Sequence, residues 1–149
     1  MKAGIIGVGK MGLSHCGIIG GLPNVHLEAV CDTSKLVLKA FKKYTKVQCF
    51  QDYKKLIDVA SLDCVIIAIP TKMHAEVVAY ALNKGLHVFC EKPFVLNVTD
   101  GVKLIELADS KGLVNQVGFH NRYIGTFNKM KTFLLDSIIG EIYHFHAKS

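Results

Sequence analysis

The residues best able to do chemistry in this chain fall in two short motifs, each directly after an apolar run. The first follows residues 3–6 and consists of Gly7, Val8, Gly9, Lys10, Met11 and Gly12. The second follows residues 86–89 and consists of Cys90, Glu91, Lys92 and Pro93. A glycine-rich turn admits phosphate groups, and a lysine at a strand end can stabilise developing negative charge. In this order, the two motifs favour hydride transfer with a dinucleotide.

The glycine motif has the spacing of a dinucleotide-binding turn between a strand and a helix. Gly7 permits the tight turn, Gly9 lets a pyrophosphate approach the backbone, and Gly12 lets the helix pack against the strand. The free N–H groups of that helix, expected over residues 10–19, would face the phosphates. The alternative is a glycine-rich turn that binds nothing.

An acidic residue stands where a dinucleotide site requires one. Asp32 ends an apolar run, residues 25–31, about twenty residues after Gly12, where a carboxylate reaches the ribose hydroxyls. A carboxylate repels a 2′-phosphate, so Asp32 favours NAD, while nearby Lys35 keeps NADP possible. With the strand before the loop and the helix after it, Asp32 favours dinucleotide binding over an unliganded turn.

The composition is that of a globular domain. The chain has 149 residues, 50% hydrophobic and 20% charged, which argues against disorder. Its apolar stretches are too short to span a membrane, and we see no signal peptide. Five cysteines without metal-ligand spacing suggest apolar positions in a reducing cytoplasm.

The net charge of +6 raises the question of nucleic acid. The lysines are scattered over expected helix surfaces, and Arg122 is the one arginine of the sequence. Basicity of this kind is typical of a solvated face, so we expect no nucleic-acid partner and no membrane partner. An anionic cofactor or substrate explains the charge better.

Strand and helix patterns alternate along most of the chain. We expect strands over residues 2–6, 25–31, 47–50, 63–69, 86–90 and 113–118. We expect helices over residues 10–19, 34–44, 52–59 and 71–83, and a further one from an N-cap at Asn97 to about Lys111. This order predicts an α/β fold with a doubly wound parallel sheet, the Rossmann fold, over residues 1–120.

Residues 121–149 depart from this order. A helix is expected over residues 124–137, followed by alternation over residues 142–147 that is typical of a strand with one solvated face. Such a strand belongs to a different, mixed or antiparallel sheet. We therefore expect a linker helix and the truncated start of a second, α+β domain, with the sequence ending inside it.

Taken together, these motifs resemble the N-terminal part of the Gfo/Idh/MocA oxidoreductases, the glucose–fructose oxidoreductase and inositol dehydrogenase group. The resemblance covers the whole chain. It rests on the glycine motif, His15, Asp32, Ile69-Pro70-Thr71, His74, Glu91-Lys92-Pro93 and the stretch from Gly118 to Tyr123. It implies a complete enzyme roughly twice this length, whose second domain supplies most substrate contacts and a catalytic histidine or aspartate–histidine pair. It also implies that these residues alone do not turn over substrate.

Lys92 is the residue we expect to be catalytic. It lies at the carboxyl end of a parallel strand, where ligands bind in this architecture, and Pro93 restricts its conformation. A cationic lysine at a hydroxyl stabilises the developing alkoxide as hydride leaves carbon. The resemblance implies this role for Lys92, a cofactor-side place for Glu91, and a cis bond before Pro93. The alternative is a solvated loop lysine.

Other positions are weaker candidates. Ile69, Pro70 and Thr71 are expected to line the cofactor with their backbone at the switch point of the sheet. His74 faces either the ribose or solvent, and His15 either packs, caps or contacts the ligand. The resemblance places Asn121 and Arg122 near the nicotinamide; the alternative is a polar linker pair. His144 and His146 share a strand face without a third ligand, so we expect no metal.

The sequence therefore predicts the nucleotide-binding half of an NAD(P)-dependent oxidoreductase acting on a secondary alcohol of a sugar, sugar derivative or cyclitol. A homo-oligomer formed through the second-domain sheet is expected for the complete protein. One alternative is a non-catalytic dinucleotide-binding sensor or regulator of the same fold, and another is a structural protein. The sequence does not name the substrate.

Overall fold

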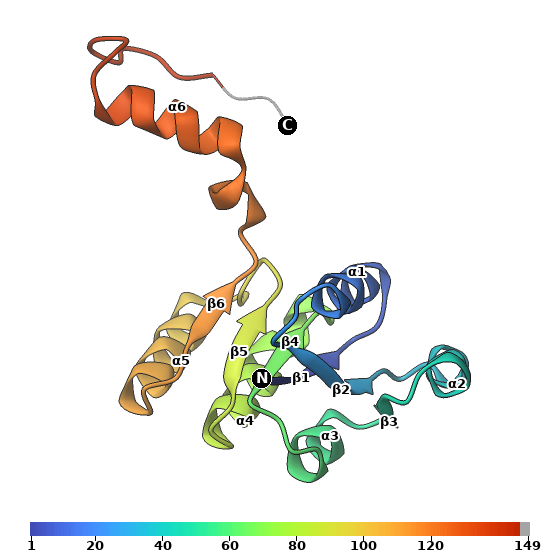
Figure 1. Cartoon of the computed structure of the whole chain (residues 1–149). Coiled ribbons are helices and arrows are strands. Elements are labelled where there is room, and N and C mark those ends of the chain that lie inside the picture. The colour runs from blue at the N-terminus through green and yellow to red at the C-terminus, as the bar shows by residue number, and fades with distance from the viewer. Residues whose placement is uncertain (147–149) are drawn as a thin grey trace. The chain divides into compact units, whose positions relative to one another are not determined.

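The structure, a computed structural model, describes residues 1–146 and contains a six-stranded parallel sheet flanked by helices (Figure 1). The strand order is β3-β2-β1-β4-β5-β6. The strands are β1 (Lys2–Ile6), β2 (His26–Cys31), β3 (Gln48–Phe50), β4 (Cys64–Ile67), β5 (His87–Cys90) and β6 (Asn115–Val117). The helices are α1 (Lys10–Gly20), α2 (Lys35–Tyr44), α3 (Tyr53–Val59), α4 (His74–Asn83), α5 (Val98–Ser110) and α6 (Gly125–Leu135). The predicted doubly wound sheet is confirmed.

The central strand β1 is buried on both faces, whereas β4 and β5 are fully buried on one face and partly buried on the other. Neighbouring residues of a strand point to opposite faces, so Ile5 packs in the layer under α1 and α2. Ile6 packs in the larger layer under α3, α4 and α5. Both side chains are almost wholly inaccessible to water. A sheet covered on both sides holds its strand ends in fixed relative positions.

The helix boundaries follow the predicted capping signals. Asn97 is the N-cap of α5, and its side-chain oxygen accepts a hydrogen bond from the Thr99 N–H at 2.8 Å. Gly85, with a φ of 79°, follows α4 in a left-handed conformation. The predicted helix over residues 71–83 differs at its start, because Thr71–Met73 form a 3-10 turn after Pro70 and the α-helix begins at His74.

The chain divides into two compact units, Met1–Gly118 and Phe119–Ser149. The second contains the short 3-10 helix His120–Tyr123 and α6. A strand is predicted over residues 142–147; residues 142–146 are not part of a strand in the structure, and Ala147 lies outside the described residues, so a strand within a complete second domain stays a prediction. Alternation alone does not form a strand: a strand needs a partner to complete its hydrogen bonds.

Among residues 1–146, no helix combines the length and the apolar character needed to cross a membrane.

Among the glycines, Gly12 has the least room for a side chain, and this gives a prediction about stability. A Cβ at Gly12 would lie 1.9 Å from the Gly7 carbonyl oxygen, so Gly12→Ala should destabilise the fold by about 3 kcal/mol or more. Gly17 lies in the same helix and has no atom within 4 Å of its ideal Cβ. Gly17→Ala should therefore stabilise the chain by about 0.5–1 kcal/mol. Urea unfolding of both variants checks the pair, and equal effects would contradict the packing described.

Candidate functional site

The glycine loop leaves an open approach to the start of α1. Gly7 has a φ of 90°, and a Cβ there would lie 2.4 Å from the Ala68 carbonyl oxygen at the end of β4. Gly9 is exposed, with nothing within 4 Å of its ideal Cβ. As the N-cap of α1 it brings no side chain to the free N–H groups of the first turn, which contains no acidic residue. The loop therefore fits a pyrophosphate.

Asp32 fixes this loop to the end of β2. Its Oδ2 accepts a hydrogen bond from the Val8 N–H at 2.7 Å, and its Oδ1 accepts one from the Ser34 N–H at 2.8 Å. The Gly7 N–H donates to the Cys31 carbonyl at 2.8 Å and adds to the connection. An ionised carboxylate has about four acceptor positions, so Asp32 retains capacity for ribose hydroxyls. The chain thus has the acceptor that the adenosine half of a dinucleotide needs.

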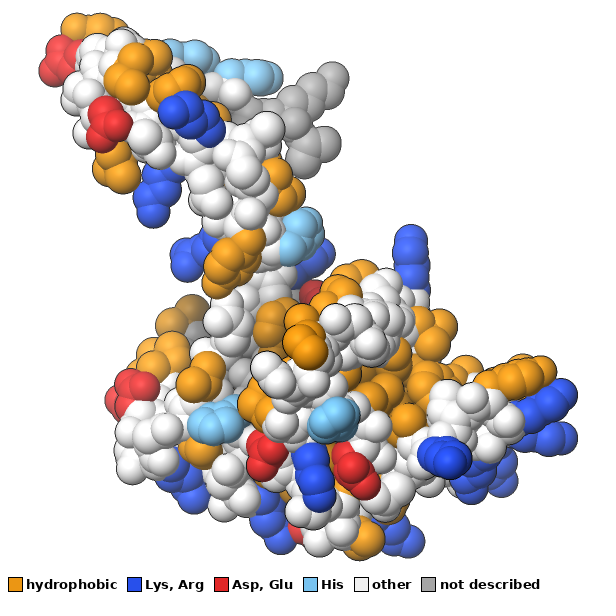
Figure 2. Space-filling view, viewed as in Figure 1, with side chains coloured by type: hydrophobic (Ala, Val, Ile, Leu, Met, Phe, Trp, Pro, Cys, Tyr) orange, Lys and Arg blue, Asp and Glu red, His pale blue; other side chains and the backbone are white. Residues whose placement is uncertain are grey.

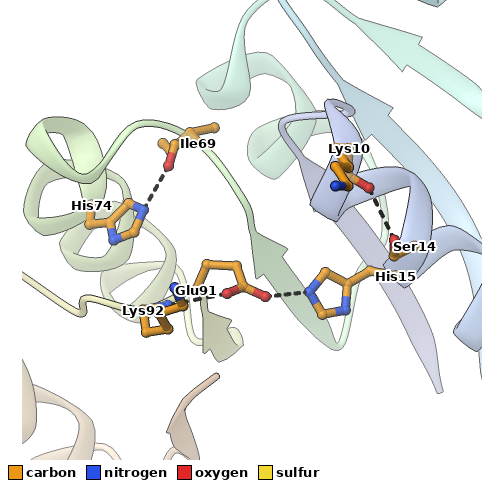
Figure 3. A network of polar contacts seen from close by, with 7 residues as sticks. All are labelled: Lys10, Ser14, His15, Ile69, His74, Glu91 and Lys92. Carbon is orange, nitrogen blue, oxygen red and sulfur yellow. Dashed lines mark hydrogen bonds and ion pairs between the residues drawn. The ribbon is translucent and has the colours of Figure 1, made fainter. Parts of the chain in front are cut away.

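Glu91, directly after β5, pairs with His15 on α1 (Figure 3). The distance from Oε1 of Glu91 to Nε2 of His15 is 2.8 Å, and the two side chains are 13% and 14% exposed. The His15 ring also packs edge-on against Phe89, with centroids 5.2 Å apart. His15 therefore connects the helix of the phosphate loop to the end of β5, which is more specific than the packing or capping role considered from the sequence.

The second oxygen of Glu91 holds the backbone of Lys92. Oε2 accepts from the Lys92 N–H at 3.3 Å. Gly118 leaves room for this carboxylate, because a Cβ there would lie 3.2 Å from the same oxygen. The Lys92–Pro93 bond is cis, which confirms what the family resemblance implied. The Lys92 side chain is exposed, and within residues 1–146 its ammonium takes part in no ion pair.

His74 is buried rather than at the surface. Its ring is 1% exposed, with Nε2 2.9 Å from the Ile69 carbonyl oxygen (Figure 3). Nδ1 lies 3.0 Å from the Pro93 carbonyl oxygen and 3.1 Å from that of Phe94. Carbonyl oxygens only accept, so the ring donates in each bond that forms. The surface alternative is wrong, and instead of offering a free nitrogen to a ribose the ring connects the turn after β4 to the loop after Lys92.

The topology brings most of the predicted site residues to one end of the sheet. β1, β4 and β5 are neighbours and parallel, so the glycine loop, Ile69-Pro70-Thr71 and Glu91-Lys92 follow adjacent strand ends. The strand order reverses between β1 and β4, which is where open α/β sheets bind ligands. Asn121 and Arg122 lie in the second unit, where the Arg122 guanidinium is 5.8 Å from the Phe119 ring centroid. Their contact with a nicotinamide stays a prediction.

Two buried cysteines are unsuited to nucleophilic chemistry. Burial raises the pKa of the Cys31 and Cys90 thiols to about 12, with smaller contributions from neighbouring carboxylates. The cysteines are free thiols, and these two pack in the larger core layer. They behave as the small apolar residues that the sequence predicts.

Comparison with known proteins identifies the family. Residues 1–119 match the GFO_IDH_MocA model, described as an oxidoreductase family with an NAD-binding Rossmann fold, and the chain belongs to this family. It is 32% identical over 152 aligned positions to the inositol 2-dehydrogenase of Salmonella typhimurium, covering 99% of this chain and 45% of that protein. It is 28% identical over 141 residues to the glucose-6-phosphate 3-dehydrogenase of Bacillus subtilis, and this match covers 95% of this chain and 40% of that protein.

A solved structure agrees with this assignment. The scyllo-inositol dehydrogenase of Lactobacillus casei, with bound cofactor NAD(H) and scyllo-inositol, is 29% identical and superposes with a TM-score of 0.89. The match covers 95% of this chain and 43% of that one. The chain therefore has the NAD-binding domain of the family, and it spans less than half the length of these relatives.

The buried His74 ring provides a test of the site's architecture. His74→Ala should lower the free energy of unfolding by about 3 kcal/mol, because it leaves a cavity and unpaired carbonyls. It should also raise amide exchange after Lys92. The matched control His26→Ala, at an exposed position of β2, should change stability by less than about 1 kcal/mol. Urea unfolding and hydrogen exchange measure both, and a His74 variant as stable as the His26 variant would refute the connection.

Proposed function

We propose that this chain is the nucleotide-binding part of an oxidoreductase that transfers hydride between a nicotinamide cofactor and a secondary alcohol. The observation that carries the proposal is the His15–Glu91 contact, which joins the helix of the glycine loop to the residue before Lys92. A domain that only binds a dinucleotide has no need of a lysine beside the carboxylate that contacts that helix. The family membership of residues 1–119 supports the same reading.

The cofactor would be held by residues already described. The exposed N–H groups of Gly9 and the first turn of α1 would bind the pyrophosphate, and Asp32 the adenosine ribose. Val8, Lys10 and Met11 complete the loop, while the backbone of Ile69, Pro70 and Thr71 would line the nicotinamide half. The bound nicotinamide supplies the hydride acceptor. Asp32 favours NAD, and NADP is accepted less well.

Lys92 would act on the alcohol. An ammonium at the hydroxyl stabilises the alkoxide that develops as hydride leaves carbon, and it assists removal of the proton by a neighbouring base. Glu91 fixes the backbone of Lys92 from one side, and His74 fixes the loop beyond it from the other. We propose a sugar, sugar derivative or cyclitol as substrate, because the relatives named above are dehydrogenases of inositol and of glucose 6-phosphate.

We further propose that residues 121–149 begin a substrate domain and that Asn121 and Arg122 take part in cofactor binding. Large apolar side chains of α6, namely Phe127, Met130, Phe133 and Leu135, are exposed in the second unit. Exposed apolar side chains in this number favour burial against further structure. We also propose that the complete protein forms a homo-oligomer through the sheet of its second domain and that it is located in the cytoplasm.

Asp32 gives a prediction about cofactor choice. NADH should bind the purified chain more tightly than NADPH, because the carboxylate repels a 2′-phosphate. Asp32→Asn removes the charge but keeps an acceptor oxygen. It should lower the ratio of the NADPH to the NADH dissociation constant about tenfold, which is equivalent to about 1.4 kcal/mol. Fluorescence titration with both cofactors measures this. Tighter binding of NADPH by the unchanged chain would reverse the assignment.

The role of Lys92 is tested in a complete protein that contains these residues. Lys92→Ala should lower turnover of a polyol or sugar by about two to four powers of ten, with NADH affinity nearly unchanged. Lys103→Ala, which removes an exposed lysine from α5, is the control and should leave both quantities unchanged. If the unaltered complete protein binds NADH but turns over no polyol or sugar, a non-catalytic sensor becomes the better account.

A further inference from the structure

A groove of about 520 Å³ lies between α2, β3 and the start of α3, and four lysines line it. Lys35, Lys39 and Lys42 come from one face of α2, at intervals of four and three residues, and Lys55 comes from α3. Figure 2 shows lysine side chains gathered over the α2 end of the sheet. The lysines that look scattered in the sequence therefore converge on one concave surface.

The positive charge of this groove is not neutralised within the part of the chain that the structure describes. None of the four lysines forms an ion pair with residues 1–146. Asp52 is the one carboxylate in the lining, and its Oδ1 accepts the Lys54 N–H at 2.9 Å as the N-cap of α3. Like charges at these helix spacings repel one another weakly, and a bound anion would relieve this repulsion.

Protection of the sheet edge is a simpler explanation for the four lysines. β3 is an edge strand, and lysines beside an edge discourage pairing with other chains. That purpose does not require lysines from two helices to surround one hollow. The floor of the groove is also apolar, with Leu38 buried and Phe50 partly buried. A volume of this size lies in the range of small-molecule sites.

We propose that this groove binds a small anion with two or more linked phosphate groups, at a site separate from the dinucleotide site. Lysine ammonium groups bind phosphate as point charges, and several of them around one hollow suit a polyphosphate. The lining contains no residue of the glycine loop and does not include Asp32, and Lys35 is its one residue that the sequence links to a cofactor phosphate, the 2′-phosphate of NADP. An extended nucleic acid is less suitable, because the lysines surround a hollow and the lining has no arginine. The proposal is independent of the hydride-transfer function.

The test uses sodium tripolyphosphate as the probe and the ¹⁵N-labelled chain at constant ionic strength. Amide shifts should be centred on α2, β3 and the start of α3.

The double variant Lys39→Gln/Lys42→Gln should weaken tripolyphosphate binding at least tenfold. The control Lys43→Gln/Lys46→Gln removes the same amount of charge from two lysines that do not line the groove. Lys43 lies over the Tyr44 ring. This control should weaken tripolyphosphate binding less than threefold. Saturating NADH should leave the affinity unchanged.

Five results would overturn the proposal. One is that tripolyphosphate does not bind. Another is that the two double variants lose the same amount of affinity for tripolyphosphate, because the binding would then depend only on the overall charge of the chain. Shifts centred on the amides of residues 9–12, or displacement of the probe by NADH, would assign the anion to the dinucleotide site. Tighter binding of a short single-stranded oligonucleotide than of tripolyphosphate would point to nucleic acid. NADH titration of the Lys39/Lys42 variant separates this test from that of the proposed function.

Discussion

The carboxylate of Glu91 joins parts of the chain that are far apart in sequence, and the candidate site depends on it. One oxygen contacts His15 on the helix that begins at the glycine loop, and the other accepts the backbone N–H of Lys92. The two side chains are largely shielded from water, so water competes little for the hydrogen bond between them. Loss of either partner would leave the other partly buried without its contact. The phosphate loop and the lysine are thereby held in one arrangement.

The packing of the sheet makes such a contact possible. Because β1, β4 and β5 are parallel neighbours that share the larger core layer, their carboxyl ends are fixed with respect to one another. His74 adds a second connection, from the turn after β4 to the loop after Lys92. Gly12 and Gly118 contribute by having no side chain where the helix start and the Glu91 carboxylate need the space. Each of these features acts through backbone position rather than through direct contact with a ligand.

The features that the sequence predicts are local ones. The glycine spacing, Asp32 and the Asn97 cap each depend on neighbouring residues, and the parallel sheet follows from the order of apolar runs. The His15–Glu91 pair is different, because 76 residues separate its partners and no spacing rule connects them. His74 contacts backbone carbonyls, which leave no mark in the sequence. The convergence of four lysines also depends on how two helices flank β3. Residues 142–146 form no strand in the structure, because alternation in the sequence indicates one solvated face but does not supply the partner strand that completes the hydrogen bonds.

The most direct test of the central claim is a crystal structure of the chain with bound NAD(H). The account predicts the pyrophosphate on the N–H groups of residues 9–12, the adenosine ribose on Asp32, and the nicotinamide on the side of Lys92, with the His15–Glu91 contact intact. A nicotinamide lying away from Lys92, or a cofactor that binds only after the His15–Glu91 contact has opened, would contradict it.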